Sequence, residues 1–262
     1  MKNQKHLSKK KRKTCRIAVL LTVCVLAAGT GCGKTVIDTE SQIAEEIMNY
    51  QGLSASTEID VTNFSEGDID RLFYSEMINE EVSERINGKS YIENNDVSLA
   101  DLRYLRMLYM DIDGKTHIGE MIVNEKIAVD VLEIFRELYR QSYPIELMVL
   151  VDDYQANDEL SMSANNTSAF NYRKVENTDV LSIHSLGMAV DINPLYNPYI
   201  YTLEDGTEIC SPKMGSRYAD RTKEFDYKID EDDLAYRLFT EHGFTWGGNW
   251  ENSKDYQHFE KQ

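Results

Sequence analysis

Cysteine is scarce in this sequence, and its scarcity excludes two common ways of stabilising a fold. The chain has four cysteines among 262 residues, and three of them, Cys15, Cys24 and Cys32, lie within the first 32 residues. Only Cys210 lies in the rest of the chain. We therefore expect neither a disulfide framework nor a zinc cluster built from cysteines in the body of the protein.

Proline is also rare, with four residues, whereas 42% of the chain is hydrophobic and 28% is charged. This composition is typical of a globular protein and excludes extensive disorder. The length of 262 residues suffices for one full-sized domain with additional segments, and it permits two.

Basic residues become few once the N-terminal segment is set aside. Eight of the 28 lysines and arginines lie within residues 1–32, which contain no acidic residue. The remaining chain has 20 basic residues against 45 acidic ones, a formal charge near −25. Such a surface repels nucleic acid, so we exclude that class of partner. An acidic ligand would need a local positive group within a binding site.

The N-terminal segment has the layout of an export signal. A basic head precedes an apolar run of twelve residues, Ile17–Ala28, which is shorter than the roughly 20 residues that span a bilayer comfortably. The following Gly29-Thr30-Gly31-Cys32 resembles the lipobox of bacterial lipoproteins, although Gly29 stands where leucine is preferred. We expect residues 1–32 to be a lipoprotein-type signal peptide. The protein would then be extracytoplasmic and anchored to the bacterial membrane through a lipidated Cys32 or an uncleaved N-terminal anchor.

The rest of the chain divides into two parts by pattern. Residues 33–98 begin with an acidic, polar stretch that suits a tether, and they continue with scattered helical spacing to which we assign no definite structure. Residues 99–262 carry clearer signals, and we treat them as the functional domain.

The order of strand and helix signals predicts the fold class of this domain. Residues 105–110 and 117–123 read as two strands joined across Asp113-Gly114, and Asn124 can cap a helix with apolar residues at helical spacing through Leu138. Residues 145–151 and 186–192 read as further strands, and residues 232–242 as a helix closed by Gly243. The elements mix without regular βαβ alternation, so we expect an α+β fold with a mainly antiparallel central sheet flanked by helices.

Two stretches contain residue types that can carry chemistry. In the first, Asp191 lies in an apolar, strand-like run seven residues after His184, and a buried carboxylate needs a metal ion, an arginine or a helix N-terminus as its partner. The second is Trp246-Gly247-Gly248-Asn249-Trp250, followed by Asp255 and His258. Two histidines and one carboxylate would fill three zinc positions and leave the fourth for water. Each spacing taken separately is weak, and a buried polar cluster is the simpler alternative.

The combination of these motifs resembles the D-alanyl-D-alanine carboxypeptidase family of zinc peptidases. The quoted pattern is Ser-x-His-x-x-Gly-x-Ala-x-Asp from Ser182 to Asp191, followed by Trp-Gly-Gly-x-Trp and Asp-x-x-His-Phe. The family includes VanY-type carboxypeptidases and L-alanyl-D-glutamate endopeptidases, and its fold is related to the signalling domain of Hedgehog proteins. The similarity extends from about Leu102 to Phe259, so residues 99–262 would be a zinc peptidase domain.

The resemblance implies a role for each matching residue. It makes His184, Asp191 and His258 the zinc ligands and places Asp255 at the general-base position, with a carboxylate that orients a histidine as the alternative. It implies that Arg173 binds the substrate and stabilises the oxyanion, with a structural ion pair as the alternative. Ser182 would bind substrate or orient a ligand. Trp246 would bind substrate, with packing beneath the site as the alternative.

These expectations combine into one function and one rival. The chain would be a membrane-anchored zinc peptidase that cuts the stem peptides of peptidoglycan, either as a D-Ala-D-Ala carboxypeptidase or as an L-Ala-D-Glu endopeptidase. The rival is a non-catalytic, zinc-bearing lipoprotein that binds the cell wall, because a metal site does not by itself imply hydrolysis.

Overall fold

The computed structural model describes residues 39–175 and 178–262. The expected signal peptide and Cys32 lie outside the described residues. Within the described part of the chain, no helix combines the length and the apolar character needed to cross a membrane. The described residues belong to one compact unit.

The first sheet is antiparallel, with the strand order β1 (Glu58–Ile59), β4 (Thr116–Asn124), β3 (Leu102–Met110) and β2 (Tyr74–Met77). Its centre is the predicted hairpin, in which Leu102 pairs with Asn124 at one end and Met110 with Thr116 at the other. Gly114 adopts φ +78° in the connecting turn, a conformation that glycine reaches without strain. The two hairpin strands are therefore confirmed, and each is longer than predicted.

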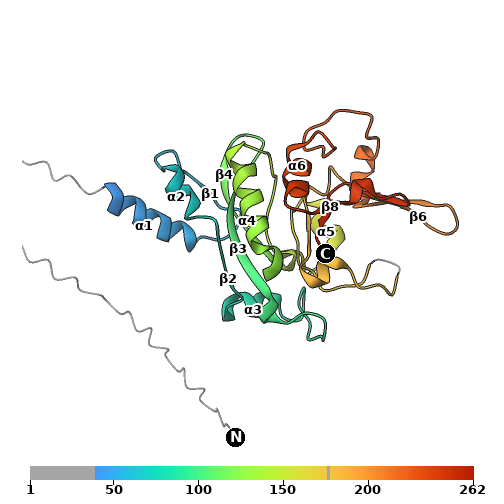
Figure 1. Cartoon of the computed structure of the whole chain (residues 1–262), viewed down its shortest axis with the longest axis horizontal. Coiled ribbons are helices and arrows are strands. Elements are labelled where there is room, and N and C mark those ends of the chain that lie inside the picture. Colours follow the sequence, from blue (N-terminus) through green and yellow to red (C-terminus); the bar gives the residue numbers. More distant parts are fainter. Residues whose placement is uncertain (1–38, 176–177) are drawn as a thin grey trace, which may run out of the picture. The chain divides into compact units, whose positions relative to one another are not determined.

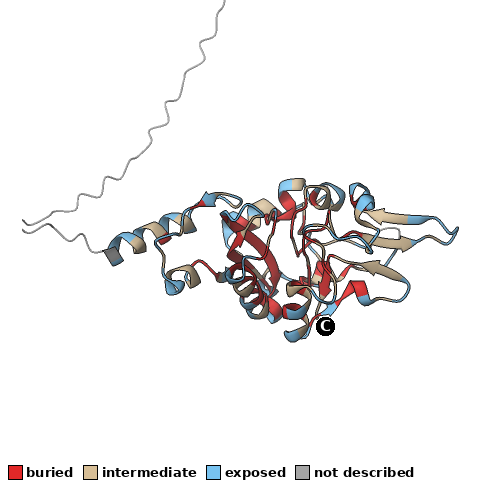
Figure 2. Ribbon diagram, turned by 90° about the horizontal axis from the view of Figure 1, so that it is seen from above, coloured by how far each residue is buried: buried red, intermediate tan, exposed pale blue. Residues whose placement is uncertain are grey.

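Helix α4 (Glu125–Arg140) follows directly from β4 and packs along the hairpin (Figure 1). It begins where predicted, because the Asn124 side chain accepts a hydrogen bond from the Lys126 backbone N–H. Its apolar positions recur at helical spacing and are buried with the sheet in the main hydrophobic core. Figure 2 shows the buried residues concentrated in this hairpin and helix.

The structure differs from the expectation for residues 39–98. Where a tether was expected, the chain forms helix α1 (Thr39–Gln51) and strand β1. The later part, to which no definite structure was assigned, forms helix α2 (Glu66–Asp70), strand β2 and helix α3 (Glu80–Ile86). Strands β1 and β2 complete the two edges of the first sheet, and Ile47, Leu72 and Phe73 are buried in the main core. Because few apolar residues in this region carry that packing, the sequence pattern alone did not reveal it.

The C-terminal part builds two small antiparallel sheets around short helices. Strands β5 (Ala189–Asp191), β10 (His258–Glu260) and β8 (Thr245–Trp246) form one sheet, and β7 (Glu208–Ser211), β6 (Tyr199–Thr202) and β9 (Ser253–Asp255) form the other. The α-helices here are α5 (Asp158–Ser163) and α6 (Leu234–Glu241), and Gly243 follows α6 at φ +81° as predicted. The 3₁₀ helices of the whole unit are η1 (Leu99–Asp101), η2 (Val151–Tyr154), η3 (Ile183–Leu186), η4 (Lys213–Tyr218) and η5 (Gly247–Asn249).

Two predicted strands were wrong in extent. Residues 145–151 are largely buried, but they make only an isolated bridge from Leu147 to Asn166 and turn into η2 at Val151. Residues 186–192 contain only the three-residue strand β5, because Gly187 reverses the chain at φ +67° after η3. The predicted fold class is confirmed, since helices combine with antiparallel sheets in the described residues.

Candidate metal centre

Three short elements bring His184, Asp191 and His258 together. His184 lies on η3, whose first turn is capped by the Ser182 side chain accepting from the His184 backbone N–H. Asp191 ends β5 and His258 begins β10, and these two residues are direct partners in the antiparallel ladder. Directly opposite residues project from the same face of a sheet, so strand register alone places this carboxylate beside this imidazole.

The three side chains converge closely and are shielded from solvent. The Asp191 carboxylate lies 3.2 Å from His184 Nε2 and 3.0 Å from His258 Nδ1, and those two nitrogens are 3.1 Å apart. His184 is 5% exposed and His258 is 3% exposed. One ligand atom from each residue lies within 4.8 Å of the others, which is the arrangement of a three-residue metal site.

The outer contacts of the two histidines decide which nitrogen can bind a cation. His184 Nδ1 lies 2.6 Å from the Ala169 carbonyl oxygen, which can only accept, so Nδ1 carries the proton. His258 Nε2 lies 3.2 Å from a carboxylate oxygen of Glu260 and donates to it. In the neutral rings, His184 Nε2 and His258 Nδ1 then face one another as lone pairs, and a metal cation beside Asp191 satisfies both. The donor set therefore fits a metal ion.

Charge coupling within this group is strong even without a cation. Burial opposes the charged form of His258, but the hydrogen bonds to Asp191 and Glu260 outweigh burial and raise its pKa to about 10. Burial likewise opposes ionisation of Asp191, but the nearby His184 and the hydrogen bonds from both histidines hold its pKa far below the usual range. The site thus stabilises positive charge at the point where the three side chains meet.

Asp255 ends β9, three residues before His258. Its Oδ1 atom is buried and accepts no hydrogen bond from any described residue. Burial raises the pKa of Asp255 to about 7; His258 and Arg173 lower it, while Asp191 adds to the rise. A Cβ atom at Gly247 would stand 2.8 Å from Asp255 Cβ and 3.2 Å from His258 Cβ, so the glycine permits this close approach.

Arg173 and Ser182 lie near this centre but are engaged in other contacts. The Arg173 guanidinium pairs with the Asp158 carboxylate, which corresponds to the structural alternative, yet its side chain remains 34% exposed. It also lies close enough to Asp255 to lower that residue's pKa. Ser182 is buried and caps η3, so it orients the segment that carries His184.

The structure corrects the expectation that Trp246 binds substrate. Trp246 is 5% exposed, packs against Tyr236, Tyr256 and Phe259 in the main core, and donates its indole N–H to the Tyr256 carbonyl. A Cβ atom at Gly248 would stand 2.3 Å from the Trp246 ring, so the adjacent glycine allows the chain to close over it. The other tryptophan, Trp250, is only partly buried and lies against His258.

Trp250 begins a row of aromatic rings that leads away from the metal centre. Its ring centroid lies 5.3 Å from that of His258 and 6.3 Å from that of Tyr199, which stacks on Tyr201 at 4.8 Å. Tyr199 is the direct ladder partner of Asp255, so both side chains project from the same face of the β7-β6-β9 sheet. The candidate base and this aromatic row therefore share one surface.

Sequence reasoning missed Glu260, whose carboxylate contacts His258. It stands two positions after His258 on β10, and alternate residues of a strand share a face. That spacing was the available signal, because a metal-binding histidine usually donates its other N–H to a carboxylate or carbonyl group.

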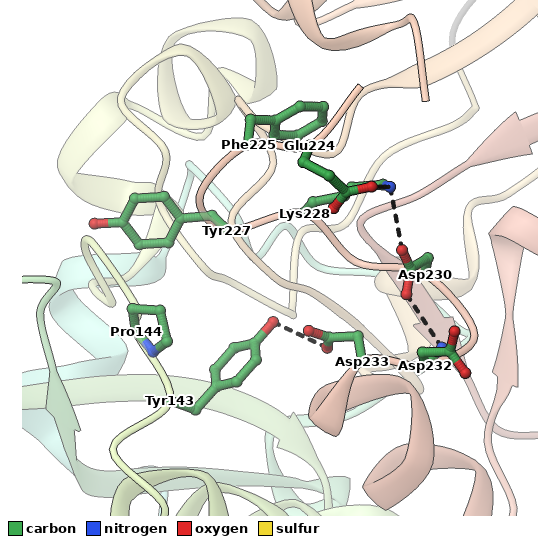
Figure 3. Close-up of a pocket in the computed structure, with 9 residues that line it drawn as sticks. All are labelled: Tyr143, Pro144, Glu224, Phe225, Tyr227, Lys228, Asp230, Asp232 and Asp233. Atoms are coloured by element: carbon green, nitrogen blue, oxygen red, sulfur yellow. Dashed lines mark hydrogen bonds and ion pairs between the residues drawn. The ribbon is translucent and has the colours of Figure 1, made fainter. Parts of the chain in front are cut away.

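A second hollow is lined by residues outside the candidate metal centre (Figure 3). Its volume is about 540 Å³, and its walls carry Tyr143, Lys228 and the acidic side chains of Glu224, Asp230, Asp232 and Asp233. The Tyr143 hydroxyl donates to Asp233 at 3.1 Å, and Lys228 pairs with Asp230 at 3.3 Å. None of its lining residues belongs to the His184, Asp191 and His258 group.

Comparison with known proteins gives one match. Residues 176–261 match the family model described as D-alanyl-D-alanine carboxypeptidase, a peptidase family, and this range contains the three converging residues and Asp255 but begins after Arg173. Neither curated proteins nor solved structures gave a significant match. The match confirms the resemblance on which the site residues were chosen: residues 176–261 are similar to the D-alanyl-D-alanine carboxypeptidase family.

Proposed function

We propose that this chain is a zinc-dependent peptidase that hydrolyses peptide bonds in the stem peptides of peptidoglycan. The observation that carries the proposal is the convergence of His184 Nε2, His258 Nδ1 and the Asp191 carboxylate. Asp255 adds a buried, unpartnered oxygen, and its charge interacts with those of His258 and Asp191. The family segment supports peptidase chemistry and a D-alanyl peptide as substrate.

His184, Asp191 and His258 would hold the metal. Two imidazoles and one carboxylate suit zinc, although cobalt or manganese can accept the same donors. Zinc bound in this way polarises a substrate carbonyl and acidifies water. Ala169 and Glu260 keep both imidazoles in the orientation that directs their free nitrogens inward.

Asp255 would transfer the proton. Its Oδ1 atom takes a proton from the attacking water and later returns it to the departing amine. The raised pKa of this carboxyl suits both steps, because a group that titrates near neutral pH both accepts and releases a proton readily.

Arg173 and the aromatic row would bind the substrate. The pairing with Asp158 holds the Arg173 guanidinium in place, and its exposed part can bind a substrate carbonyl or carboxylate. Trp250, Tyr199 and Tyr201 extend the surface beyond the reacting bond, which favours a substrate longer than a dipeptide.

The test is mass spectrometry of purified stem peptides incubated with the metal-loaded protein. Loss of one D-alanine identifies a carboxypeptidase, and a fragment beginning at D-glutamate identifies an endopeptidase. His184→Ala and Asp255→Asn should abolish either cleavage, whereas Glu251→Gln, at an exposed position four residues before Asp255, should leave it unchanged. Wild-type protein that cuts no stem peptide of any length would instead favour the non-catalytic wall-binding lipoprotein.

We also propose that the protein acts outside the cytoplasm, attached to the bacterial membrane through a lipidated Cys32. The basic head, the apolar run Ile17–Ala28 and the small residues before Cys32 support this location. Metabolic labelling with a fatty acid should modify the wild type and leave Cys32→Ser unlabelled. Labelling that persists in Cys32→Ser would contradict the assignment of the lipidated residue.

A further inference from the structure

A cavity of about 620 Å³ lies in the part of the molecule that the family match does not cover. It is enclosed by the first sheet, by helix α3 and by the turn that follows helix α1. All its lining residues fall between Gln51 and Asp153, so none belongs to the candidate metal centre. Its volume is within the range of small-molecule sites in proteins.

The floor of the cavity is a row of polar side chains across three strands. Tyr74 on β2 pairs directly with Arg106 on β3, and Arg106 pairs directly with Glu120 on β4. Direct partners share a sheet face, and the alternate residues Leu105 and Met121 lie in the main hydrophobic core. The polar row is therefore turned away from that core and toward the cavity.

Glu120 is already neutralised by its neighbours. The Arg85 guanidinium donates two hydrogen bonds to its carboxylate, at 2.8 and 2.6 Å, and the Tyr104 hydroxyl donates a third at 2.5 Å. These hydrogen bonds and the Arg85 charge hold the pKa of Glu120 below its usual range even though burial opposes ionisation. Arg85 also lies 3.5 Å from an Asp153 carboxylate oxygen, so Glu120, Arg85 and Asp153 form a network of ion pairs along one wall.

Arg106 makes no direct ion pair, although its charge acts on its strand partner Glu120 and lowers the pKa of that carboxyl. It is 6% exposed, and its guanidinium donates to the Tyr104 hydroxyl at 3.3 Å and to the Leu53 carbonyl at 2.6 Å, both of them neutral acceptors. Within residues 39–175 and 178–262, no carboxylate oxygen lies within 4 Å of it. A buried guanidinium that makes no direct ion pair is costly, and its planar fork is shaped to bind a carboxylate.

The rim of the cavity carries the opposite charge. Glu76 and Glu81 line it and are exposed, so the cavity is positive at its floor and negative at its mouth. This gradient repels a simple anion at the entrance but suits a molecule with a carboxylate at one end and an ammonium group at the other.

We propose that this cavity binds a free α-amino acid. The carboxylate of the amino acid contacts Arg106, and its ammonium group lies toward Glu76 and Glu81. The proposal does not rest on the proposed peptidase activity, because no residue of the cavity contributes to the metal centre.

The first test is isothermal titration of the full-length chain, solubilised in detergent, with glycine, L-alanine and D-alanine. Amino acids can chelate zinc, so the titration uses the His184→Ala variant treated with a chelator. We expect at least one amino acid to bind, and acetate and alaninamide, which each lack one charged group, to bind at least tenfold more weakly. Absence of amino-acid binding, or acetate binding as tightly as alanine, would overturn the proposal.

Variants of the cavity then locate the site. Arg106→Gln should weaken amino-acid binding at least tenfold, and Arg106→Lys should weaken it less. Because Arg106 is buried, its substitution could disturb folding as well as binding. The double variant Glu76→Gln/Glu81→Gln changes only exposed residues, so it provides a second measurement without that complication. It should weaken alanine binding at least threefold, whereas Glu84→Gln, on the same helix but outside the lining, should bind like the parent. Unchanged binding in the double variant would contradict the assignment of the ammonium contact.

Discussion

The orientation of the two histidines in the candidate metal centre depends on two groups outside the three converging ligands. The Ala169 carbonyl and the Glu260 carboxylate each bind the outer nitrogen of one histidine. They thereby fix the tautomers and direct His184 Nε2 and His258 Nδ1 toward Asp191. A carbonyl group cannot be removed by substitution, so Glu260 is the residue that tests this arrangement.

Glu260→Ala should weaken metal binding about 10- to 100-fold, the usual effect of removing such an outer contact. Glu260→Gln should have a smaller effect, because the amide oxygen still accepts a hydrogen bond from His258 Nε2. Competition with a chromophoric chelator measures the affinity, and Glu251→Gln is the control for loss of an exposed acid. Wild-type affinity in Glu260→Ala would show that the imidazole is held by other contacts.

Asp233 should make the fold less stable as pH rises. Burial raises the pKa of Asp233 to about 6, above the usual aspartate value of about 4, so between these pH values the folded state binds more protons than the unfolded state. Stability therefore falls as pH increases from about 4 to about 6, and the loss is complete above pH 6. Asp233→Asn keeps the oxygen that caps α6 and accepts from Tyr143, so it should gain about 1 kcal/mol at pH 7.

Urea unfolding of both proteins at pH 4 and pH 7 measures this difference. The gain should be present at pH 7 and should largely disappear at pH 4, where Asp233 is mostly protonated in the folded protein. A gain of equal size at both pH values would mean that the substitution acts through packing rather than through ionisation.

Short strands carry Asp255 and His258, and neighbouring elements hold these strands in place. Strands β9 and β10 have three residues each, so neither is stabilised by a long ladder of its own. They are held by their partners β6 and β5 and by the close approach of η5, where Gly247 and Gly248 occur. The glycine pair therefore belongs to the geometry of the site as well as to the packing around Trp246.

Gly247→Ala should lower kcat/KM at least tenfold while leaving the protein folded. The added Cβ atom would lie 2.7 Å from the Asp255 carbonyl oxygen, so β9 must shift and Asp255 with it. Small displacements of a catalytic group have large effects on rate. The control is Gly67→Ala, whose Cβ atom would meet nothing closer than 3.8 Å. Full activity in Gly247→Ala would argue against Asp255 as the base.

Trp250→Ala should raise KM for long stem peptides more than for a dipeptide. Its ring joins His258 to the aromatic residues of β6, so removing it interrupts the surface that would contact the distant part of a substrate. Trp250→Phe keeps an aromatic face and should retain most of the affinity. Steady-state kinetics on both substrate lengths measures the effect; equal changes on both would mean that Trp250 only supports His258.

The whole unit is held together by packing between residues 39–98 and the rest of the described chain. Helix α1 and strands β1 and β2 lie outside the matched family segment, yet they complete the first sheet and contribute to the main core. The cavity above Arg106 exists only because these segments enclose it. Residues 39–98 are thus part of the folded body.

Ile47→Ala should therefore destabilise the entire unit by about 2–4 kcal/mol, because it leaves a cavity in a shared core. Its neighbour Met48 is 70% exposed, and Met48→Ala should have little effect. Thermal unfolding followed by circular dichroism should show one lowered transition for Ile47→Ala. A separate early transition, with the remainder unchanged, would show that α1 folds as an independent segment.

Features that depend on nearby residues were readable from the sequence. The β3–β4 hairpin, the Asn124 cap of α4 and the Gly243 end of α6 each depend on local turn chemistry or helical spacing, and the structure contains all three. Two short segments, residues 182–191 and 255–258, resemble a known family, and this resemblance also selected the residues that converge. Each such signal is contained in a short stretch of chain.

Other features required the tertiary structure, because they depend on contacts between distant segments. Trp246 and Trp250 are equivalent in a motif, and only packing against Tyr236 and Phe259 assigns one to the core. The pairing of Arg173 with Asp158 and the enclosure of Arg106 likewise join residues that no spacing rule connects. Burial and charge balance are properties of the assembled fold, so they decided which polar residues face a site.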